Sequence, residues 1–287
     1  MSAKRADRVA TAVLTLAALS LIIILAWFLL YVLVRGLPVL NWQFLTSPPR
    51  ELEAGGGVGP QLFNSFYLLF LSLLFSLPVG LGTGIYLAEY ARPSRLTDLV
   101  RLSVESLATV PSIVLGLFGM IIFVNFFGLG FTILGGALTL ALLNLPLLVR
   151  VTEEALRAVP QSYREASLAL GATQWQTIRR VVIPAALPGI LTGITLTAGR
   201  ALGETAVLIY TAGTSASRSL FNFDLFNSGE TLAVHLWYVR AEGLVPDAAR
   251  IADGAAALLI IAVLFFNLFL GVPTRLLHRR LTGGQSR

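Results

Sequence analysis

The chain has 287 residues, of which 56% are hydrophobic and 13% are charged. Soluble domains average roughly 45–50% apolar and about 25% charged residues, so this composition excludes a soluble globular protein and indicates an integral membrane protein. The absence of cysteine excludes a disulfide scaffold, an iron–sulfur centre and cysteine-based zinc sites. The net charge of +6 is spread unevenly along the chain, and this distribution predicts the topology.

Charged residues delimit the apolar runs, which we interpret as membrane spans. The first run lies between Arg8 and Arg35 and holds 26 uncharged residues, enough for one span of about 20 residues. Lys4 and Arg5 resemble the basic start of a signal peptide. However, the run is too long for a signal segment and no small-residue cleavage site follows it, so we expect a retained first helix. The second helix is expected at about 61–88, after a glycine-rich segment.

Four further spans bring the predicted total to six. Residues 106–149 are uncharged, and a straight helix of this length would measure about 66 Å, roughly twice the hydrocarbon core. They therefore predict a helical hairpin, with its turn at 125–130, where asparagine and two glycines cluster. The fifth and sixth spans are expected at about 184–212 and 254–274.

The basic residues predict the orientation. With the N-terminus inside, 15 of the 21 lie on the inner side, five lie on the outer side, and Arg200 lies within the membrane. By the positive-inside rule, this distribution predicts that both termini are cytoplasmic.

The longest predicted cytoplasmic connection, residues 150–183, has the pattern of two short helices. Ser162 followed three positions later by Glu165 has the pattern of a capping box at a helix start. Gly171 is suited to end that helix at its C′ position. A second short helix is expected to follow and to end near Arg180. Physics alone leaves open that the segment is an amphipathic element on the membrane surface.

The same segment resembles the EAA loop of permeases from ATP-binding-cassette importers. The family pattern is E-A-A-x3-G-x9-I-x-L-P, and this chain matches it from Glu165 to Pro184 with three substitutions of similar shape. In that family the segment forms the coupling helix, which docks in a groove of the ATPase subunit. The resemblance therefore assigns to ATPase coupling Glu165, Ala166, Ser167, Gly171 and Pro184. It implies that Glu165 pairs with a basic residue of the ATPase and that Gly171 allows close helix approach.

Further motifs narrow the resemblance to the PstA family of permeases from phosphate importers, over roughly residues 40–272. These motifs are S-P-P at 47–49, G-G-G-V-G-P at 55–60, G-T-G-I-Y-L-A-E-Y at 82–90, V-P-S-I-V at 110–114 and R-A-L-G-E-T at 200–205. The resemblance implies an all-α, polytopic membrane protein of six helices with the MetI-like fold of type I importer permeases. It also implies a bacterial inner-membrane location and ATP-driven import of inorganic phosphate.

The resemblance also implies the domain organisation. The expected parts are a cytoplasmic tail and first helix at 1–40, a periplasmic loop at 41–60, a permease domain at 61–274 with a coupling segment at 152–183 and a periplasmic loop at 213–250, and a cytoplasmic tail at 275–287.

The expected partners follow from the same resemblance. They are a PstC-like second permease, two PstB-like ATPase subunits, a PstS-like phosphate-binding protein and membrane lipid, with no nucleic acid. The chain has no P-loop or other catalytic motif, so we expect no enzymatic activity and no bound cofactor. ATP and Mg would be used by the partner ATPase.

Arg200 is the candidate substrate residue. An arginine within a span is disfavoured by roughly 2.5–3.5 kcal/mol on insertion scales, so it is expected to face the bundle interior or a water-filled path. A guanidinium offers planar, bidentate donors that match phosphate oxygens. Glu204, four residues later, is expected on the same helix face, where it would hold the arginine and accept a hydrogen bond from protonated phosphate. Thr205 and Thr197 would add hydroxyls, while a purely structural Arg–Glu pair remains the alternative.

Other interpretations stay open. The same architecture would serve another oxyanion such as sulfate or molybdate, and arsenate closely resembles phosphate. A secondary transporter is a more distant alternative, because the chain has no inverted-repeat half-helices and only one intramembrane charge pair. The 213–250 loop is expected to be a solvated cap, to which the resemblance adds a role in receiving the binding protein. The G-x-x-x-G pairs Gly189/Gly193 and Gly199/Gly203 are expected to be close helix contacts.

Overall fold

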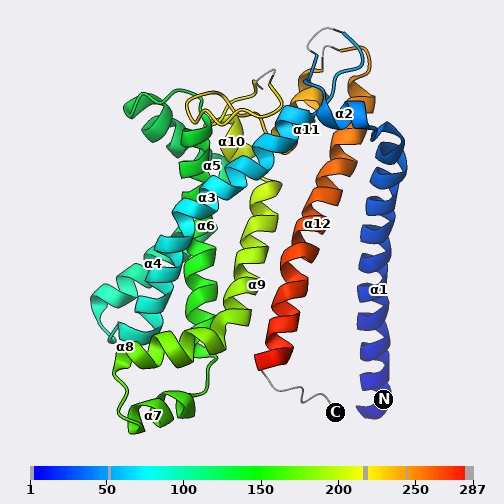
Figure 1. Cartoon of the computed structure of the whole chain (residues 1–287). Helices are drawn as coiled ribbons and strands as arrows, with labels where there is room; N and C mark the ends of the chain where they lie inside the picture. Colours follow the sequence, from blue (N-terminus) through cyan, green and yellow to red (C-terminus); the bar gives the residue numbers. More distant parts are fainter. Residues whose placement is uncertain (1–2, 51–52, 216–218, 244, 282–287) are drawn as a thin grey trace.

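The computed structural model describes residues 3–50, 53–215, 219–243 and 245–281, and this part of the chain contains helices and no strand (Figure 1). The long helices are α1 (Ala3–Gly36), α3 (Gly59–Ile85), α6 (Ile133–Arg157), α9 (Ile183–Leu202) and α12 (Ala248–Leu281). The shorter helices are η1 (Leu37–Val39), α2 (Trp42–Thr46), α4 (Arg95–Thr109), α5 (Ser112–Gly119), α7 (Gln161–Ala169), α8 (Gln174–Thr177), α10 (Ala206–Ile209) and α11 (Leu232–Glu242). Three π-helical turns extend longer helices: η2 (Tyr86–Tyr90), η3 (Met120–Phe126) and η4 (Ile178–Val182).

The membrane spans agree with the predicted count. Five of the described helices are long and apolar enough to cross a membrane, and α4 together with α5–η3 makes a sixth if this bent pair is one span. The all-α fold prediction is therefore confirmed. In Figure 1, α7 and α8 lie at one end of the bundle and α2 and α11 at the other. These ends are termed the α7 end and the α11 end, and the sequence predicts that the α7 end is cytoplasmic.

The third predicted span differs from expectation, because it is broken. Helix α4 begins at Arg95, where the Ser94 hydroxyl accepts the Thr97 N–H at 3.2 Å, and it is bent by 102° from α5–η3. The break falls at Val110, whose ψ of 128° is extended, as expected for a residue that precedes proline. The predicted hairpin turn at 125–130 is confirmed by two glycines with positive φ, at 128 and 130.

Helices α3 and α6 form the central contact of the bundle. Gly136 packs against Leu68, Gly80 against Leu148, and Gly84 against Thr152, so the two helices run in the same direction. The separation is tight at the α7 end, where a Cβ added to Gly84 would lie 2.5 Å from Thr152 Cβ. Small residues at such positions let two backbones approach closely in a membrane.

Glycines on α9 also make close helix contacts. Gly189 packs against Ala155 and Gly193 against Val151, both on α6, which confirms the prediction for that pair. Gly199 packs against Asn267 of α12, as predicted. A Cβ added to Gly203 would be near only the Arg200 carbonyl of the same helix, so the predicted helix contact is wrong for Gly203.

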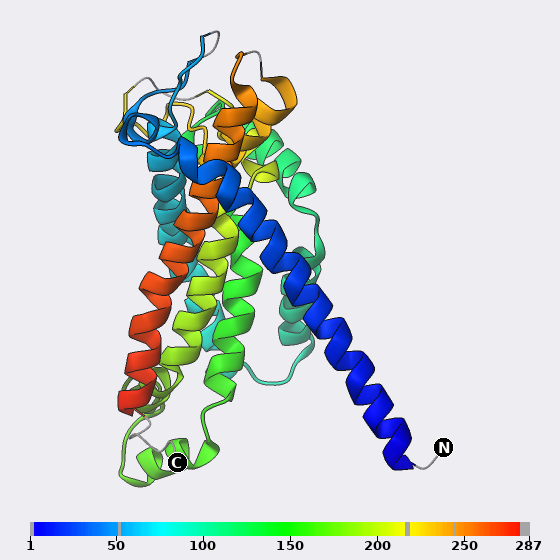
Figure 2. The same cartoon turned by 90° about the vertical axis from the view of Figure 1, so that its right-hand side faces the viewer.

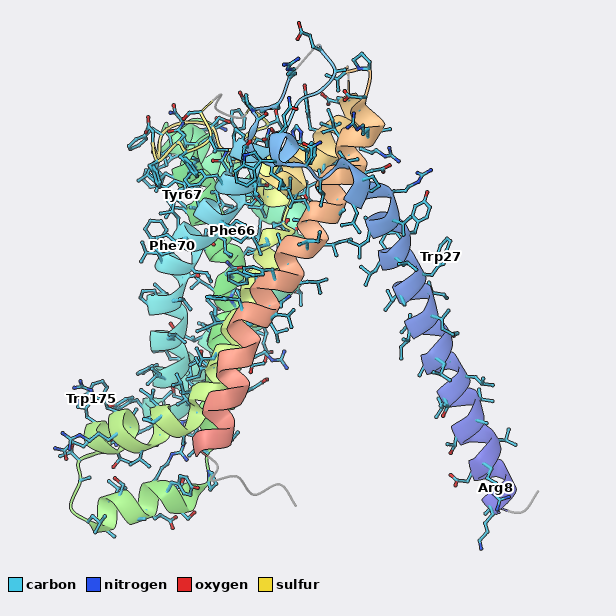
Figure 3. The ribbon with its side chains drawn as sticks, turned by 45° about the vertical axis from the view of Figure 1, so that its right-hand side comes forward. Arg8, Trp27, Phe66, Tyr67, Phe70 and Trp175 are labelled. Carbon is cyan, nitrogen blue, oxygen red and sulfur yellow. The ribbon has the colours of Figure 1, made fainter. Side chains whose placement is uncertain are left out.

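Helix α1 stands apart from the bundle. Gly36, at its end, packs against Asp253 and Ala257 of α12, and from there α1 diverges from the other helices (Figure 2). The apolar side chains of its spanning segment are exposed, including Trp27 (Figure 3).

Candidate functional site

The predicted substrate residues lie at a break in the fifth span. Helix α9 ends at Leu202, before the predicted end at residue 212, and the Gly203 N–H bonds back to the Arg200 carbonyl at 3.2 Å. Helix α10 then begins after Thr205. Arg200 therefore lies in the last turn of α9, where the helix dipole favours a cation.

The prediction that Glu204 lies on the same helix face as Arg200 is wrong. Because Gly203 ends the helix, Glu204 lies beyond it and turns toward α10, where its Oε1 accepts the Val207 N–H at 3.4 Å. Within the described residues no ion pair joins Arg200 to Glu204.

Arg200 is exposed, and its guanidinium has no hydrogen-bond partner in the described part of the chain. Thr205 is half-buried at the break, and its hydroxyl donates to the Gly203 carbonyl at 3.4 Å. Thr197 is fully buried and donates at 2.9 Å to the Gly193 carbonyl of its own helix, so its hydroxyl is already used in packing. Arg200, Glu204 and Thr205 thus flank the break at 203–205, whereas Thr197 lies within α9.

The second candidate site is the α7–α8 hairpin at the α7 end. The two predicted short helices are present, and Gly171 follows the first with φ +81°, as expected for a C′ glycine. The predicted capping box is wrong for α7, because its N-cap is Pro160 and Ser162 lies inside the helix. A capping box instead begins α8, where Thr173 and Gln176 bond reciprocally.

The hairpin presents an exposed surface away from the bundle. Glu165 and Ala166 are exposed on α7, and Leu170 is 90% exposed. Trp175 is 55% exposed and lies at the outer side of the hairpin (Figure 3). An apolar surface with a carboxylate beside it is suited to contact another protein.

The remaining predicted coupling residues, Ser167 and Pro184, lie within the hairpin and at the start of α9. The Ser167 hydroxyl lies 2.9 Å from the Thr177 hydroxyl and so links α7 to α8. Pro184 lies in the first turn of α9, where the missing N–H of a proline is tolerated.

A buried ion pair behind the hairpin was not singled out by the sequence. It joins Arg164 of α7 to Glu89 of η2, residues that are 75 positions apart. The only local signal was an acidic residue directly after a long apolar run.

The predicted solvated cap at 213–250 needs correction, because it contains α11 and a buried polar cluster. Gln61 Nε2 donates to Glu230 Oε2 at 2.8 Å, and His235 Nδ1 lies 3.1 Å from the same oxygen. Glu230 and His235 are 2% and 5% exposed. The cluster joins this segment to the start of α3 at the α11 end. Arg218, also in the expected cap, lies outside the described residues.

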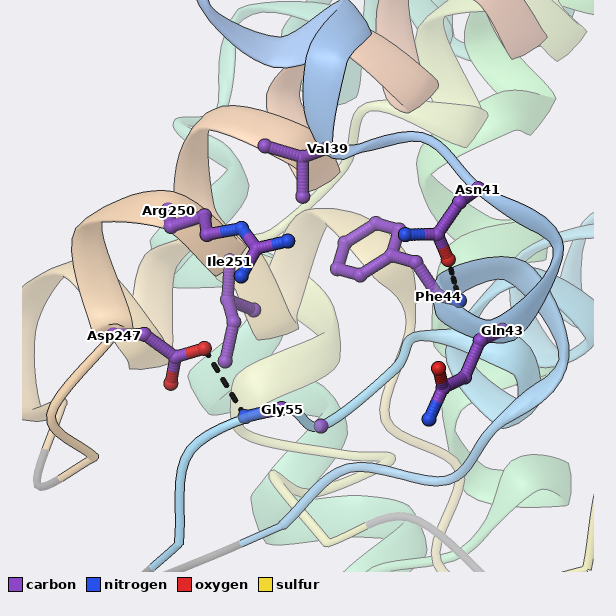
Figure 4. Close-up of a pocket in the computed structure, with 9 residues that line it drawn as sticks. Val39, Asn41, Gln43, Phe44, Gly55, Asp247, Arg250 and Ile251 are labelled. Atoms are coloured by element: carbon purple, nitrogen blue, oxygen red, sulfur yellow. Dashed lines mark hydrogen bonds between the residues drawn. The ribbon is translucent and has the colours of Figure 1, made fainter.

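A small pocket of about 150 Å³ lies between the loop before α3 and the start of α12 (Figure 4). Asp247 Oδ2 accepts the Gly55 N–H there at 3.1 Å, with Arg250 nearby. No group of three or more His, Asp or Glu side chains converges as a metal site in the described residues.

Comparison with known proteins adds to this geometry. Residues 80–283 match the family described as "Binding-protein-dependent transport system inner membrane component". The probable ABC transporter permease protein YqgI of Bacillus subtilis is 44% identical over 98% of this chain and 99% of its own length. The phosphate transport system permease protein PstA of Haemophilus influenzae is 35% identical over 85% of each chain.

Two solved structures show the same fold. A bacterial alginate ABC transporter, in complex with an alginate pentasaccharide-bound periplasmic protein, aligns with a TM-score of 0.69 at 15% identity over 96% of both chains. The MetNI methionine ABC transporter, in an inward-facing conformation, aligns with a TM-score of 0.59 at 24% identity over 77% of this chain and 94% of that chain. These likenesses confirm the predicted fold of type I importer permeases.

Proposed function

Because the chain belongs to the family of binding-protein-dependent transport system inner membrane components, we propose that it is the phosphate-selective permease of an ATP-driven importer. It pairs with a second, PstC-like permease to form the pathway. Two PstB-like ATPase subunits bind at the α7 end, which is cytoplasmic, and a PstS-like binding protein delivers phosphate at the α11 end. ATP and Mg are bound by the ATPase subunits and not by this chain.

The observation that carries the proposed phosphate selectivity is Arg200 at the α9–α10 break, which is exposed and has no partner among the described residues. A guanidinium on a membrane span requires an anion, a partner chain or water to satisfy it, because a charge in contact with the hydrocarbon region without a partner is costly. Arg200 donates two parallel hydrogen bonds to phosphate oxygens. The similarity to PstA of Haemophilus influenzae supports this substrate.

Glu204 adds selectivity for a protonated oxyanion. Its carboxylate accepts hydrogen bonds only, so beside the bound anion it favours a species that still carries a proton. Phosphate and arsenate carry one near neutral pH, whereas sulfate and molybdate do not. Thr205 adds a hydroxyl at the same break.

The α7–α8 hairpin supports the coupling role. Glu165, Ala166 and Leu170 form an exposed surface that docks on the ATPase, and Trp175 flanks it. The turn at Gly171 sets the angle between α7 and α8.

Uptake into vesicles tests the proposal. The chain is purified together with the second permease and the ATPase and reconstituted into vesicles loaded with ATP, and the binding protein is added outside. We expect labelled phosphate to enter only with ATP and the binding protein, with competition by arsenate but not by sulfate or molybdate. Uptake of sulfate or molybdate without phosphate would assign another oxyanion, and uptake driven by an ion gradient without ATP would assign a secondary transporter.

A further inference from the structure

The Arg164–Glu89 pair joins the hairpin to the second span. Arg164 Nη2 lies 2.6 Å from Glu89 Oε1, and Arg164 Nε lies 3.2 Å from Oε2, so the contact is bidentate. The two side chains are 15% and 7% exposed, which places the pair largely out of solvent. Glu89 lies in the π-helical turn η2, which ends the α3 span.

Arg164 also binds the end of α6. Its Nη1 donates to the Val159 carbonyl at 2.8 Å, and its Nη2 donates to the Leu156 carbonyl at 2.9 Å. Gln174 of α8 donates to the Glu89 carbonyl at 2.9 Å, which adds a second contact between the hairpin and η2. One guanidinium therefore connects α7, the end of α3 and the end of α6.

The geometry of this site depends on arginine and on a carboxylate together. Only the planar guanidinium supplies donors on two sides, toward a carboxylate and toward two backbone carbonyls. If either partner is lost, the other charge remains buried and uncompensated. The tight α3–α6 contact at Gly84 and Thr152 continues this connection into the bundle.

We propose that Arg164 and Glu89 are positioning residues that make the α7–α8 hairpin one rigid body with α3 and α6. Force applied to the hairpin then moves these two spans, instead of being absorbed by movement of the hairpin alone. This inference rests on the proposed function as an ATPase-coupled permease. It assigns the coupling to a contact within this chain, behind the docking surface.

Two single variants test the proposal in the reconstituted complex. Glu89→Gln removes the charge of one partner and keeps its shape, and Arg164→Lys keeps the charge but loses the fork. ATP hydrolysis is measured as the ADP formed and not as the phosphate released, because phosphate is also the transported ion. We expect Glu89→Gln to lower the phosphate imported per ATP hydrolysed by about tenfold and Arg164→Lys to have an intermediate effect. A merely structural role would lower the amount of complex but leave this ratio unchanged.

The matched control is the Arg150–Glu154 pair. Both of its residues lie on α6, 2.9 Å apart, so the pair joins two positions of one helix, and both side chains are more than half exposed. Glu154→Gln should leave import per ATP at the wild-type value. An unchanged ratio in assembled Glu89→Gln complexes, or an equal loss in Glu154→Gln, would overturn the proposal.

A cross-link provides a measurement that does not depend on either variant folding. The native chain has no cysteine, so single cysteines at Tyr90 and Gln174, both exposed, can be joined by a short bismaleimide. Because Gln174 itself contacts η2, the reference is the same double-cysteine complex before cross-linking. If η2 and the hairpin move as one body, cross-linking should leave the ATP hydrolysis and import of that complex unchanged. Loss of both on cross-linking would show relative movement and overturn the proposal.

The wild-type complex separates this inference from the proposed function. If it hydrolyses ATP but imports no phosphate, the substrate assignment fails, and the effect of the cross-link on ATP hydrolysis still tests the rigid body. If it imports phosphate and both variants keep the wild-type ratio, the rigid-body inference fails and the substrate assignment stands.

Discussion

Arg200 and Glu204 are separated by the end of a helix: the arginine lies in the last turn of α9, and the glutamate lies beyond it and accepts the Val207 N–H of α10 at 3.4 Å. The guanidinium therefore has no intrachain carboxylate to neutralise it among the described residues. This favours a role in binding an anion over that of a structural ion pair.

Arg200→Gln should abolish phosphate uptake while the complex still assembles. Glutamine keeps hydrogen-bond donors but loses the charge and the fork, and Arg200→Lys, which keeps only the charge, should restore uptake in part. Labelled phosphate uptake, normalised to the complex recovered by affinity purification, is the measurement. Wild-type uptake by assembled Arg200→Gln complexes would place the pathway elsewhere.

Gly171→Leu should uncouple ATP hydrolysis from uptake without preventing membrane insertion. Gly171 has φ +81°, a conformation that costs an L-residue with a bulky side chain about 1–2 kcal/mol, and no atom lies near its missing Cβ. Gly171→Asn is the matched control, since asparagine tolerates this conformation and should largely retain coupling. Similar import per ATP in both variants would argue against a role for the turn.

Glu230→Ala should destabilise the α11 end. It leaves the Gln61 and His235 nitrogens buried without their acceptor, at about 1–3 kcal/mol for an unsatisfied group. Thermal unfolding in detergent should show a lower midpoint. Glu242→Ala, at an exposed position on the same segment, should leave the midpoint unchanged, and an equal effect of the two changes would contradict the role of the cluster.

Gly84→Val should impair folding, whereas Gly82→Val, two positions earlier on the same helix, should be tolerated. A side chain at Gly84 would overlap Thr152 and the Val149 carbonyl, while nothing lies near the missing Cβ of Gly82. Overpacking typically costs about 1–3 kcal/mol. The yield of monodisperse protein in size-exclusion chromatography measures the difference, and equal yields would contradict the tight α3–α6 contact.

Cysteine labelling in intact cells should confirm the predicted orientation. Cysteines at Ser94 and Gln174, at the α7 end, should be protected from an impermeant maleimide until the membrane is opened. Cysteines at Glu53 and Glu242, at the α11 end, should be labelled at once. The reverse pattern would invert the topology. Thr282 suits the same test at the C-terminal side but lies outside the described residues.

The sequence by itself determined the class of protein, the approximate spans and the hairpin at the α7 end. Each of these depends on local properties. Apolar length decides which segments leave water, and a glycine at position 171 marks a helix end through its own backbone freedom. The R-A-L-G-E-T motif likewise predicts Arg200 as a candidate substrate residue from sequence alone.

Only the tertiary structure decided which charges meet. Arg164 and Glu89 pair because α7 folds back under the ends of α3 and α6, and Glu230 is buried because α11 packs beside the start of α3. The break after Leu202 separated Glu204 from Arg200, although their spacing fits one helix face. Partners distant along the chain leave no periodic signal, because side-chain pairing depends on how the helices pack and not on the hydropathy of either segment.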